Sequence, residues 1–120
     1  MTTNEIHDRA IIKMRAQYWE ALPTNAYRVR KLARKQRAAE LEPGEREELE
    51  LLVQRLTDQA VSLRFDAVAS ILTQLGTALW NHRHGRPSRD LEDLCDQLDH
   101  VVDDMTLEVM AVGLRSLWYG

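Results

Sequence analysis

The chain has 120 residues, of which 44% are hydrophobic and 29% charged. This balance excludes disorder of the whole chain and fits one folded domain spanning residues 1–120. The formal net charge of −3 disfavours a dedicated nucleic-acid binder, because such domains are usually basic.

The compartment is predicted from the cysteine content and from two missing sequence signals. The one cysteine, Cys95, excludes an intramolecular disulfide and a cysteine-based zinc site within a single chain. The N-terminal residues lack the basic and apolar stretches of a secretory signal, and no uncharged apolar run reaches the roughly 18 residues of a membrane span. We therefore expect a cytoplasmic protein.

The first predicted helix covers residues 4–22, approximately. Ile6, Ala10 and Met14 recur at helical spacing, which predicts an apolar stripe on one face. Pro23 is expected to end this helix, because the residue before a proline avoids the α region.

The second predicted helix covers residues 25–41, approximately. Val29 and Leu32 belong to a narrow apolar face. The opposite half of the helix is basic and contains no acid, and a basic face of this kind suits an acidic partner. Its six residues are Arg28, Arg30, Lys31, Arg34, Lys35 and Arg37.

The third predicted helix covers residues 43–81, approximately, and begins at Pro43, a favourable first-turn residue. Apolar residues recur every three or four positions from Leu49 to Ala78. A continuous helix of this length would be about 55 Å long, at ~1.5 Å per residue. An alternative is that the helix is interrupted near residues 62–66, although no residue there forces an interruption.

The fourth predicted helix covers residues 88–118, approximately, with Ser88 as its N-cap. Its apolar seam repeats like a heptad. The short loop before it predicts an antiparallel hairpin with the third helix. The expected fold is therefore all-α: a long antiparallel helical hairpin with two shorter helices packed on it. Because two helices are long and apolar for a lone domain of this size, we expect this bundle to be a homodimer.

The C-terminal half of the fourth predicted helix is apolar on nearly all sides. A helix of this kind must be buried on several faces, and a small bundle supplies few neighbours at its end. One alternative is that the first two helices cover it. The other is that it forms a self-association or docking surface. The residues predicted to form this interface are Leu107, Met110, Leu114, Leu117 and Trp118.

Groups that could bind a metal are scattered. His82 and His84 form a His-x-His pair in a predicted turn, and a third ligand would be needed to hold zinc or copper. Four carboxylates form a stripe on the fourth helix, opposite its apolar seam, so they are expected to face outward. These are Glu92, Asp96, Asp99 and Asp103, with His100 beside them. We expect no bound metal and no cofactor.

Catalytic chemistry finds no support in the sequence, and we expect that the protein is not an enzyme. A nucleophilic mechanism needs a nucleophile, a base and an orienting group in one pocket. Cys95 lies at the edge of the apolar seam, where a thiol usually behaves as a small inert hydrophobe. No glycine-rich phosphate-binding loop is present.

The leading functional hypothesis is a helical interaction module that binds and masks another protein, such as a transcription factor, in the manner of an anti-activator. It rests on analogy of size and fold class. One alternative is a nucleic-acid-binding regulator that uses the basic helix 28–37, although the acidic residues 40–50 that follow would repel phosphate. A more distant alternative is a bundle that binds a metal or small ligand. Two further alternatives stay open for the basic face: a solvated helix surface, or an intramolecular match to the acidic stripe of the fourth helix. A basic neighbour would relieve the repulsion between like charges four positions apart in that stripe.

Overall fold

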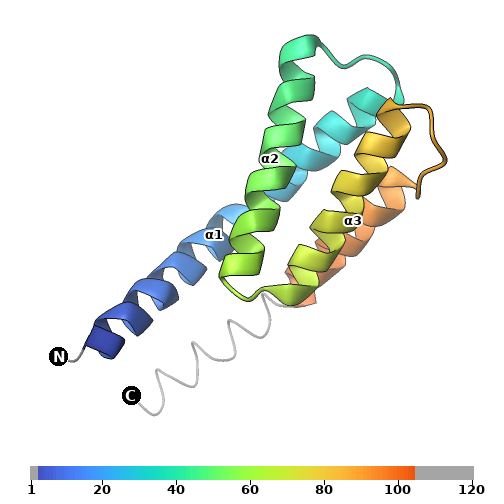
Figure 1. The fold of residues 1–120 in the computed structure, drawn as a ribbon. Helices are drawn as coiled ribbons and strands as arrows, with labels where there is room; N and C mark the ends of the chain where they lie inside the picture. Colours follow the sequence, from blue (N-terminus) through green and yellow to red (C-terminus); the bar gives the residue numbers. More distant parts are fainter. Residues whose placement is uncertain (1–2, 105–120) are drawn as a thin grey trace.

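Residues 3–104 are described by a computed structural model, and all regular elements in this range are helical. Helix α1 spans Thr3–Arg37, α2 spans Pro43–Ser62 and α3 spans Asp66–Arg83. A fourth helix occupies residues 91–104 and is orange in Figure 1. The expected all-α helical bundle is confirmed, whereas the predicted helix boundaries need three corrections. One is at the start of the fourth helix, where Asp90 and not Ser88 accepts a hydrogen bond from the backbone amide of Glu92. The other two concern Pro23 and residues 63–65.

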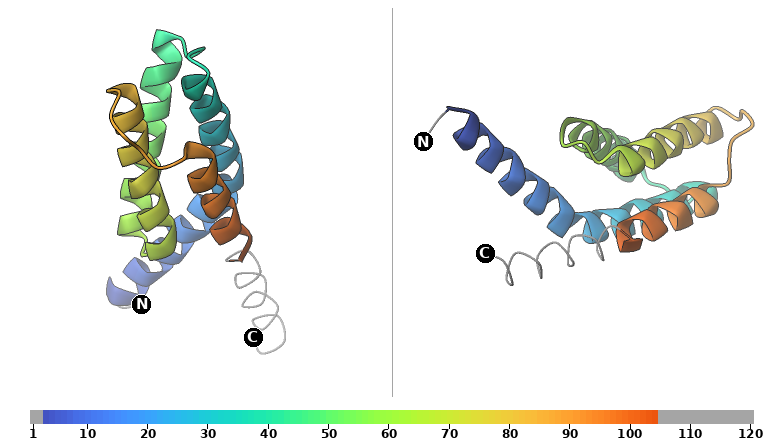
Figure 2. Two further views of the ribbon diagram at one scale, coloured as in Figure 1. Left: turned by 90° about the vertical axis from the view of Figure 1, so that its right-hand side faces the viewer. Right: turned by 90° about the horizontal axis from the view of Figure 1, so that it is seen from below.

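The second correction concerns Pro23, which does not end a helix. Helix α1 continues through it, so the two helices predicted at residues 4–22 and 25–41 are one. A proline inside a helix removes one backbone hydrogen bond and bends the axis. Here the flanking residues Leu22 and Ala26 are buried in the core, and their burial favours the continuous helix. Figure 2 (right) shows the resulting change of direction along α1.

The third correction concerns the predicted helix 43–81, which is broken at residues 63–65. Arg64 has a φ of 65°, outside the range of a right-handed helix, and the amide of Phe65 donates to the carbonyl of Ala60. Leu63 and Phe65 turn their side chains into the core, where both are buried. Helices α2 and α3 therefore form a short antiparallel hairpin, in place of the long hairpin expected between residues 43–81 and 88–118 (Figure 1).

The core lies between the α2–α3 hairpin on one side and the C-terminal half of α1 with the fourth helix on the other (Figure 2, left). Side chains at its centre have no solvent exposure, as at Leu22, Leu72 and Leu94. The ion pairs described below run in opposite directions along α1 and the fourth helix, so these two helices are antiparallel neighbours.

Three aromatic side chains close the core beside the α2–α3 turn. The Tyr18 ring stacks on the Phe65 ring with 5.5 Å between centroids, and Trp19 packs against Phe65 at the same distance. The Tyr18 hydroxyl donates to the carbonyl of Leu56 at 2.9 Å. Burial raises the pKa of Tyr18 to about 12. This cluster anchors the middle of α1, and the helix extends beyond it.

Candidate functional site

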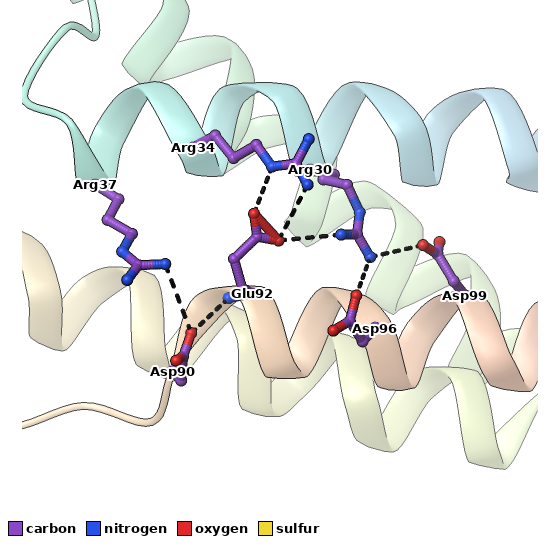
Figure 3. Close-up of polar contacts among 7 residues, drawn as sticks. All are labelled: Arg30, Arg34, Arg37, Asp90, Glu92, Asp96 and Asp99. Carbon is purple, nitrogen blue, oxygen red and sulfur yellow. Dashed lines mark hydrogen bonds and ion pairs between the residues drawn. The ribbon is translucent and has the colours of Figure 1, made fainter.

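Arg30 is the centre of an ion-pair cluster between α1 and the fourth helix (Figure 3). Its Nη1 donates to Glu92 Oε2 at 3.0 Å, while its Nη2 donates to Asp96 Oδ1 and Asp99 Oδ2, each at 2.7 Å. Only 16% of the Arg30 side chain is exposed. The hydrogen bond that Arg30 donates to Asp96 raises the pKa of Arg30, although burial acts in the opposite direction. A single guanidinium therefore holds three carboxylates of the neighbouring helix.

The cluster continues toward the C-terminal end of α1. The Arg34 guanidinium donates to Glu92, and that hydrogen bond raises the pKa of Arg34. Arg37 lies 4.0 Å from Asp90, whose carboxylate also accepts a hydrogen bond from the backbone amide of Glu92. The acidic stripe expected to face outward therefore lies against the arginines of α1, although much of Asp96 and Asp99 stays exposed.

Helix α2 neutralises two more of the predicted basic residues. Arg28 Nη2 lies 2.6 Å from Glu48 Oε2, and Lys35 Nζ lies 2.7 Å from Glu45 Oε2. The Lys35 hydrogen bond lowers the pKa of Glu45. Lys31 is the one member of the set for which residues 3–104 supply no ion pair. The basic face of α1 therefore pairs with the acidic stripe of the fourth helix, which was one of the alternatives open from the sequence. An acidic partner would have to compete with these carboxylates for the same basic residues.

The candidate metal ligands are not brought together. His82 Nδ1 lies 3.3 Å from Gln36 Nε2, whereas the His84 ring stacks on Trp80 with 4.0 Å between centroids. Within the described range, no three side chains of the His, Cys, Asp or Glu type are placed to hold one metal ion. The sequence analysis overlooked this stack, which Arg86 extends at 4.8 Å from the Trp80 ring. The spacing of four between Trp80 and His84 was the signal that could have revealed it.

Cys95 is buried, with 3% of its surface exposed. Burial raises the pKa of the Cys95 thiol to about 11, and the nearby Arg30 charge offsets only part of this effect. At neutral pH the thiol is therefore protonated and shielded, which disfavours nucleophilic chemistry at this position.

The N-terminal part of α1 exposes large apolar side chains, including Ile6 and Met14 of the stripe predicted for the first helix. We call residues 3–17 the arm, which extends beyond the end of the α2–α3 hairpin (Figures 1 and 2). Three large apolar side chains of the arm are more than half exposed: Ile6 at 56%, Ile12 at 66% and Met14 at 54%. Near its base, Arg15 lies over the Phe65 ring at 4.6 Å.

A second apolar surface is an open groove between α2 and α3, with a volume of about 700 Å³. Val53 and Leu72 are among the buried residues that line it, and Thr77 and the half-exposed Trp80 are also part of its lining. The ion pair between Glu50 and Arg83 lies among its lining residues. The groove has the shape of a docking site, but nothing in it identifies an occupant.

The five predicted interface residues, Leu107, Met110, Leu114, Leu117 and Trp118, lie outside the described residues. The helices within residues 3–104 include none that is both long enough and apolar enough to cross a membrane. Comparison of the chain with family models, curated proteins and solved structures found no match.

Proposed function

We propose that the chain is a non-enzymatic helical interaction module that regulates another protein by binding and masking it, as an anti-activator masks a transcription factor. The observation that carries this proposal is the arm of α1, where Ile6, Ile12 and Met14 are all more than half exposed. Ile6 and Met14 lie on one side of the arm and Ile12 on another, so the partner that we propose would cover the arm on more than one side. A helix of about 15 residues is marginal in water without a packed face, so an occupant would also stabilise the arm.

The apolar residues after Asp104 support the same proposal. The sequence predicts a further interface from five residues: Leu107, Met110, Leu114, Leu117 and Trp118. Interfaces concentrate their energy in a few large side chains, among which tryptophan is prominent. We propose that these five residues contribute to a homodimer interface or to the partner surface.

The ion pairs favour protein binding over the nucleic-acid alternative. Arg28, Arg30, Arg34, Lys35 and Arg37 each have a carboxylate partner in the same chain. A nucleic-acid backbone would have to displace those carboxylates before it gained a phosphate contact. No observation therefore favours a second candidate function.

Affinity capture from native lysate followed by measurement with the purified partner tests the proposal. The captured protein is identified by mass spectrometry, expressed alone and titrated against the wild-type chain by calorimetry. Leu114→Asp or Trp118→Ala should weaken binding by about 2 kcal/mol or more, which is roughly 30-fold in Kd. Leu51→Asp is the matched control, because Leu51 is 57% exposed on α2 and belongs neither to the arm nor to the five residues proposed for the interface.

Two results would contradict the proposed function. One is that the wild-type chain retains no protein beyond those retained by the Leu114→Asp variant. The other is that the captured protein binds both interface variants and the control with unchanged affinity. Circular dichroism of each variant establishes that its helices are kept.

A further inference from the structure

The groove between α2 and α3 is open at a glycine. Gly76 lines the groove, and a Cβ atom added to it would lie 3.6 Å from Val53 Cγ1, which is ordinary van der Waals contact. The packing of α3 on α2 therefore tolerates an alanine at this position. A glycine inside a helix destabilises it relative to alanine, so the fold of a single chain does not explain Gly76. The missing side chain leaves free space along the floor of the groove.

The threonines along the groove have their hydroxyl groups paired within the protein. Each donates its hydroxyl to the carbonyl four residues earlier in its own helix, at 2.7–3.1 Å: Thr57, Thr73 and Thr77. An apolar occupant would therefore cover these side chains without leaving a hydroxyl unpaired, which would be costly. Among the ways in which proteins bind apolar segments, the docking of an amphipathic helix into a groove between helices suits this lining.

Two further lining residues define the chemistry of such a helix. Trp80 is 48% exposed, and its ring stacks on the ring of His84 with 4.0 Å between centroids. Three charged residues line the groove. Glu50 and Arg83 pair with each other, whereas Asp58 has no ion pair within residues 3–104. The groove thus offers an aromatic surface and one uncompensated negative charge, which favour an apolar helix face with a positive charge beside it.

The arm of α1 has a face of this kind. Ile6, Ala10 and Met14 follow one another at steps of four residues and lie on one side of the helix. Ile6 and Met14 are both more than half exposed. Lys13, seven residues after Ile6, lies beside it on the helix circumference. Lys13 also finds no carboxylate partner in the described part of the chain. The arm therefore complements the groove in both apolar character and charge.

The arm does not reach the groove of its own chain. On this side of α1, Tyr18 packs on α2 and donates its hydroxyl to the carbonyl of Leu56 at 2.9 Å. From Tyr18 the arm leads away from the bundle, beyond the end of the α2–α3 hairpin (Figures 1 and 2). To enter its own groove, α1 would have to fold back on itself. A second copy related by a two-fold axis meets no such restriction, and the two copies would make the same contact twice.

We propose that the chain forms a two-fold homodimer in which the arm of each copy lies in the α2–α3 groove of the other, with the Ile6–Met14 side of the arm on the groove floor. The inference rests on the proposed function in one respect, namely that the exposed side chains of the arm form an interaction surface. It adds the occupant of the groove and of this side of the arm, a second copy of the chain. The side of the arm with Ile12 stays open to the masked protein.

Analytical ultracentrifugation of the full chain measures the dimer. Ile6→Asp on the arm and Thr77→Arg in the groove should each raise the dimer dissociation constant by roughly 100-fold or more, because a two-fold dimer contains each substitution twice. Thr73→Arg takes the place of Thr77→Arg if that variant loses its helical circular dichroism. Ile12→Asp and Leu51→Asp are matched controls that should leave the constant unchanged. Ile12 is 66% exposed on another side of the arm, and Leu51 is 57% exposed on α2, outside the groove lining.

Mixing the two damaged chains tests the exchange of arms. The Ile6→Asp chain keeps its groove and the Thr77→Arg chain keeps its arm, so a mixed dimer has one intact contact, whereas a dimer of either variant alone has none. A contact already lost to one substitution is not lost again to the other. We therefore expect heterodimers at concentrations at which each variant alone is monomeric.

Three results would overturn the proposal. They are a wild-type chain that stays monomeric at its highest soluble concentration, a dimer that withstands both substitutions, and a mixture of the two variants that stays monomeric. Each of these results leaves the proposed function standing if the captured partner still loses affinity on Leu114→Asp. The failure of the dimer and the failure of the proposed function can therefore be told apart.

Discussion

The two halves of α1 have the same backbone structure and opposite surroundings. Residues 18–37 bury one face in the core and pair all but one of their basic side chains with carboxylates of the fourth helix and α2. The arm instead leaves three large apolar side chains more than half exposed. Helical periodicity is equally clear in both halves of the sequence. The comparison teaches that periodicity identifies a face that can be buried, while the number of neighbouring helices decides whether it is buried in one chain.

The largest expected effect distinguishes a buried leucine from an exposed one. Leu22, in the buried half of α1, has no solvent exposure, so Leu22→Ala should lower the free energy of unfolding by about 2–5 kcal/mol. Leu51→Ala removes the same atoms from a side chain that is 57% exposed. This substitution should change the free energy of unfolding by no more than about 0.5 kcal/mol. Chemical denaturation of both variants gives the comparison. Equal losses of unfolding free energy in the two variants would contradict the difference in burial between Leu22 and Leu51.

An intermediate effect is expected at the ion-pair cluster. Arg30→Met keeps the aliphatic stem and removes the charge that holds Glu92, Asp96 and Asp99. The loss should lower the free energy of unfolding by about 1–3 kcal/mol, since hydrogen bonds to charged groups are lost and the carboxylates repel each other.

Lys31→Met is the control for that substitution, because it removes one positive charge from the same helix at a position without an ion pair in residues 3–104. Its effect should stay within about 0.5 kcal/mol. High salt should narrow the difference between the two variants, since screening weakens partly exposed pairs. If Lys31→Met were as damaging as Arg30→Met, net charge rather than the cluster would govern stability.

The smallest expected effect is a pH dependence from the buried thiol. Burial raises the pKa of Cys95 from 9.0 to about 11, so an unfolded chain releases this proton at lower pH than the folded chain does. The stabilisation is complete below about pH 9 and is lost as the pH rises toward 11. On the order of 1 kcal/mol should be lost at about pH 10.

Cys95→Ala isolates this contribution, because the slope of stability against pH between about pH 8 and 10 should then be shallower than in the wild type. The measurement stops near pH 10 because Tyr18, whose pKa burial raises from 10.0 to about 12, adds a loss of the same sign above that value. Identical slopes in the two proteins would contradict the burial of the thiol in solution.

The sequence predicted the helical class and most of the core, because apolar residues at helical spacing report directly on buried faces. Leu49, Leu52, Leu56 and Leu75 are examples, and all are buried. The intramolecular match between the basic and acidic stripes was also visible, since a row of like charges on one helix needs a row of opposite charge nearby.

The remaining features depend on contacts between distant residues and left no local signal. No glycine marks the break at residues 63–65, where Phe65 meets Tyr18 and Trp19 from far along the chain. Conversely, Pro23 gave a strong local signal that burial of the neighbouring side chains overrides. The exposure of the arm could not be read from its periodicity, because it depends on where α2 and α3 end.

Pro23 bends α1, and we expect it also to separate two parts of the helix that exchange their amide protons at different rates. It has no amide hydrogen to donate to the carbonyl of Trp19, so the hydrogen-bond ladder of α1 is interrupted within the half of the helix that packs on the core, shortly after the arm ends. Amide protons on the two sides of such an interruption exchange with solvent through different events. We expect amide protons of the arm to exchange through local fraying of the helix end, and amide protons after Pro23 to exchange only when the core opens. We therefore expect amide exchange to be faster in the arm than in the part of α1 that packs on the core.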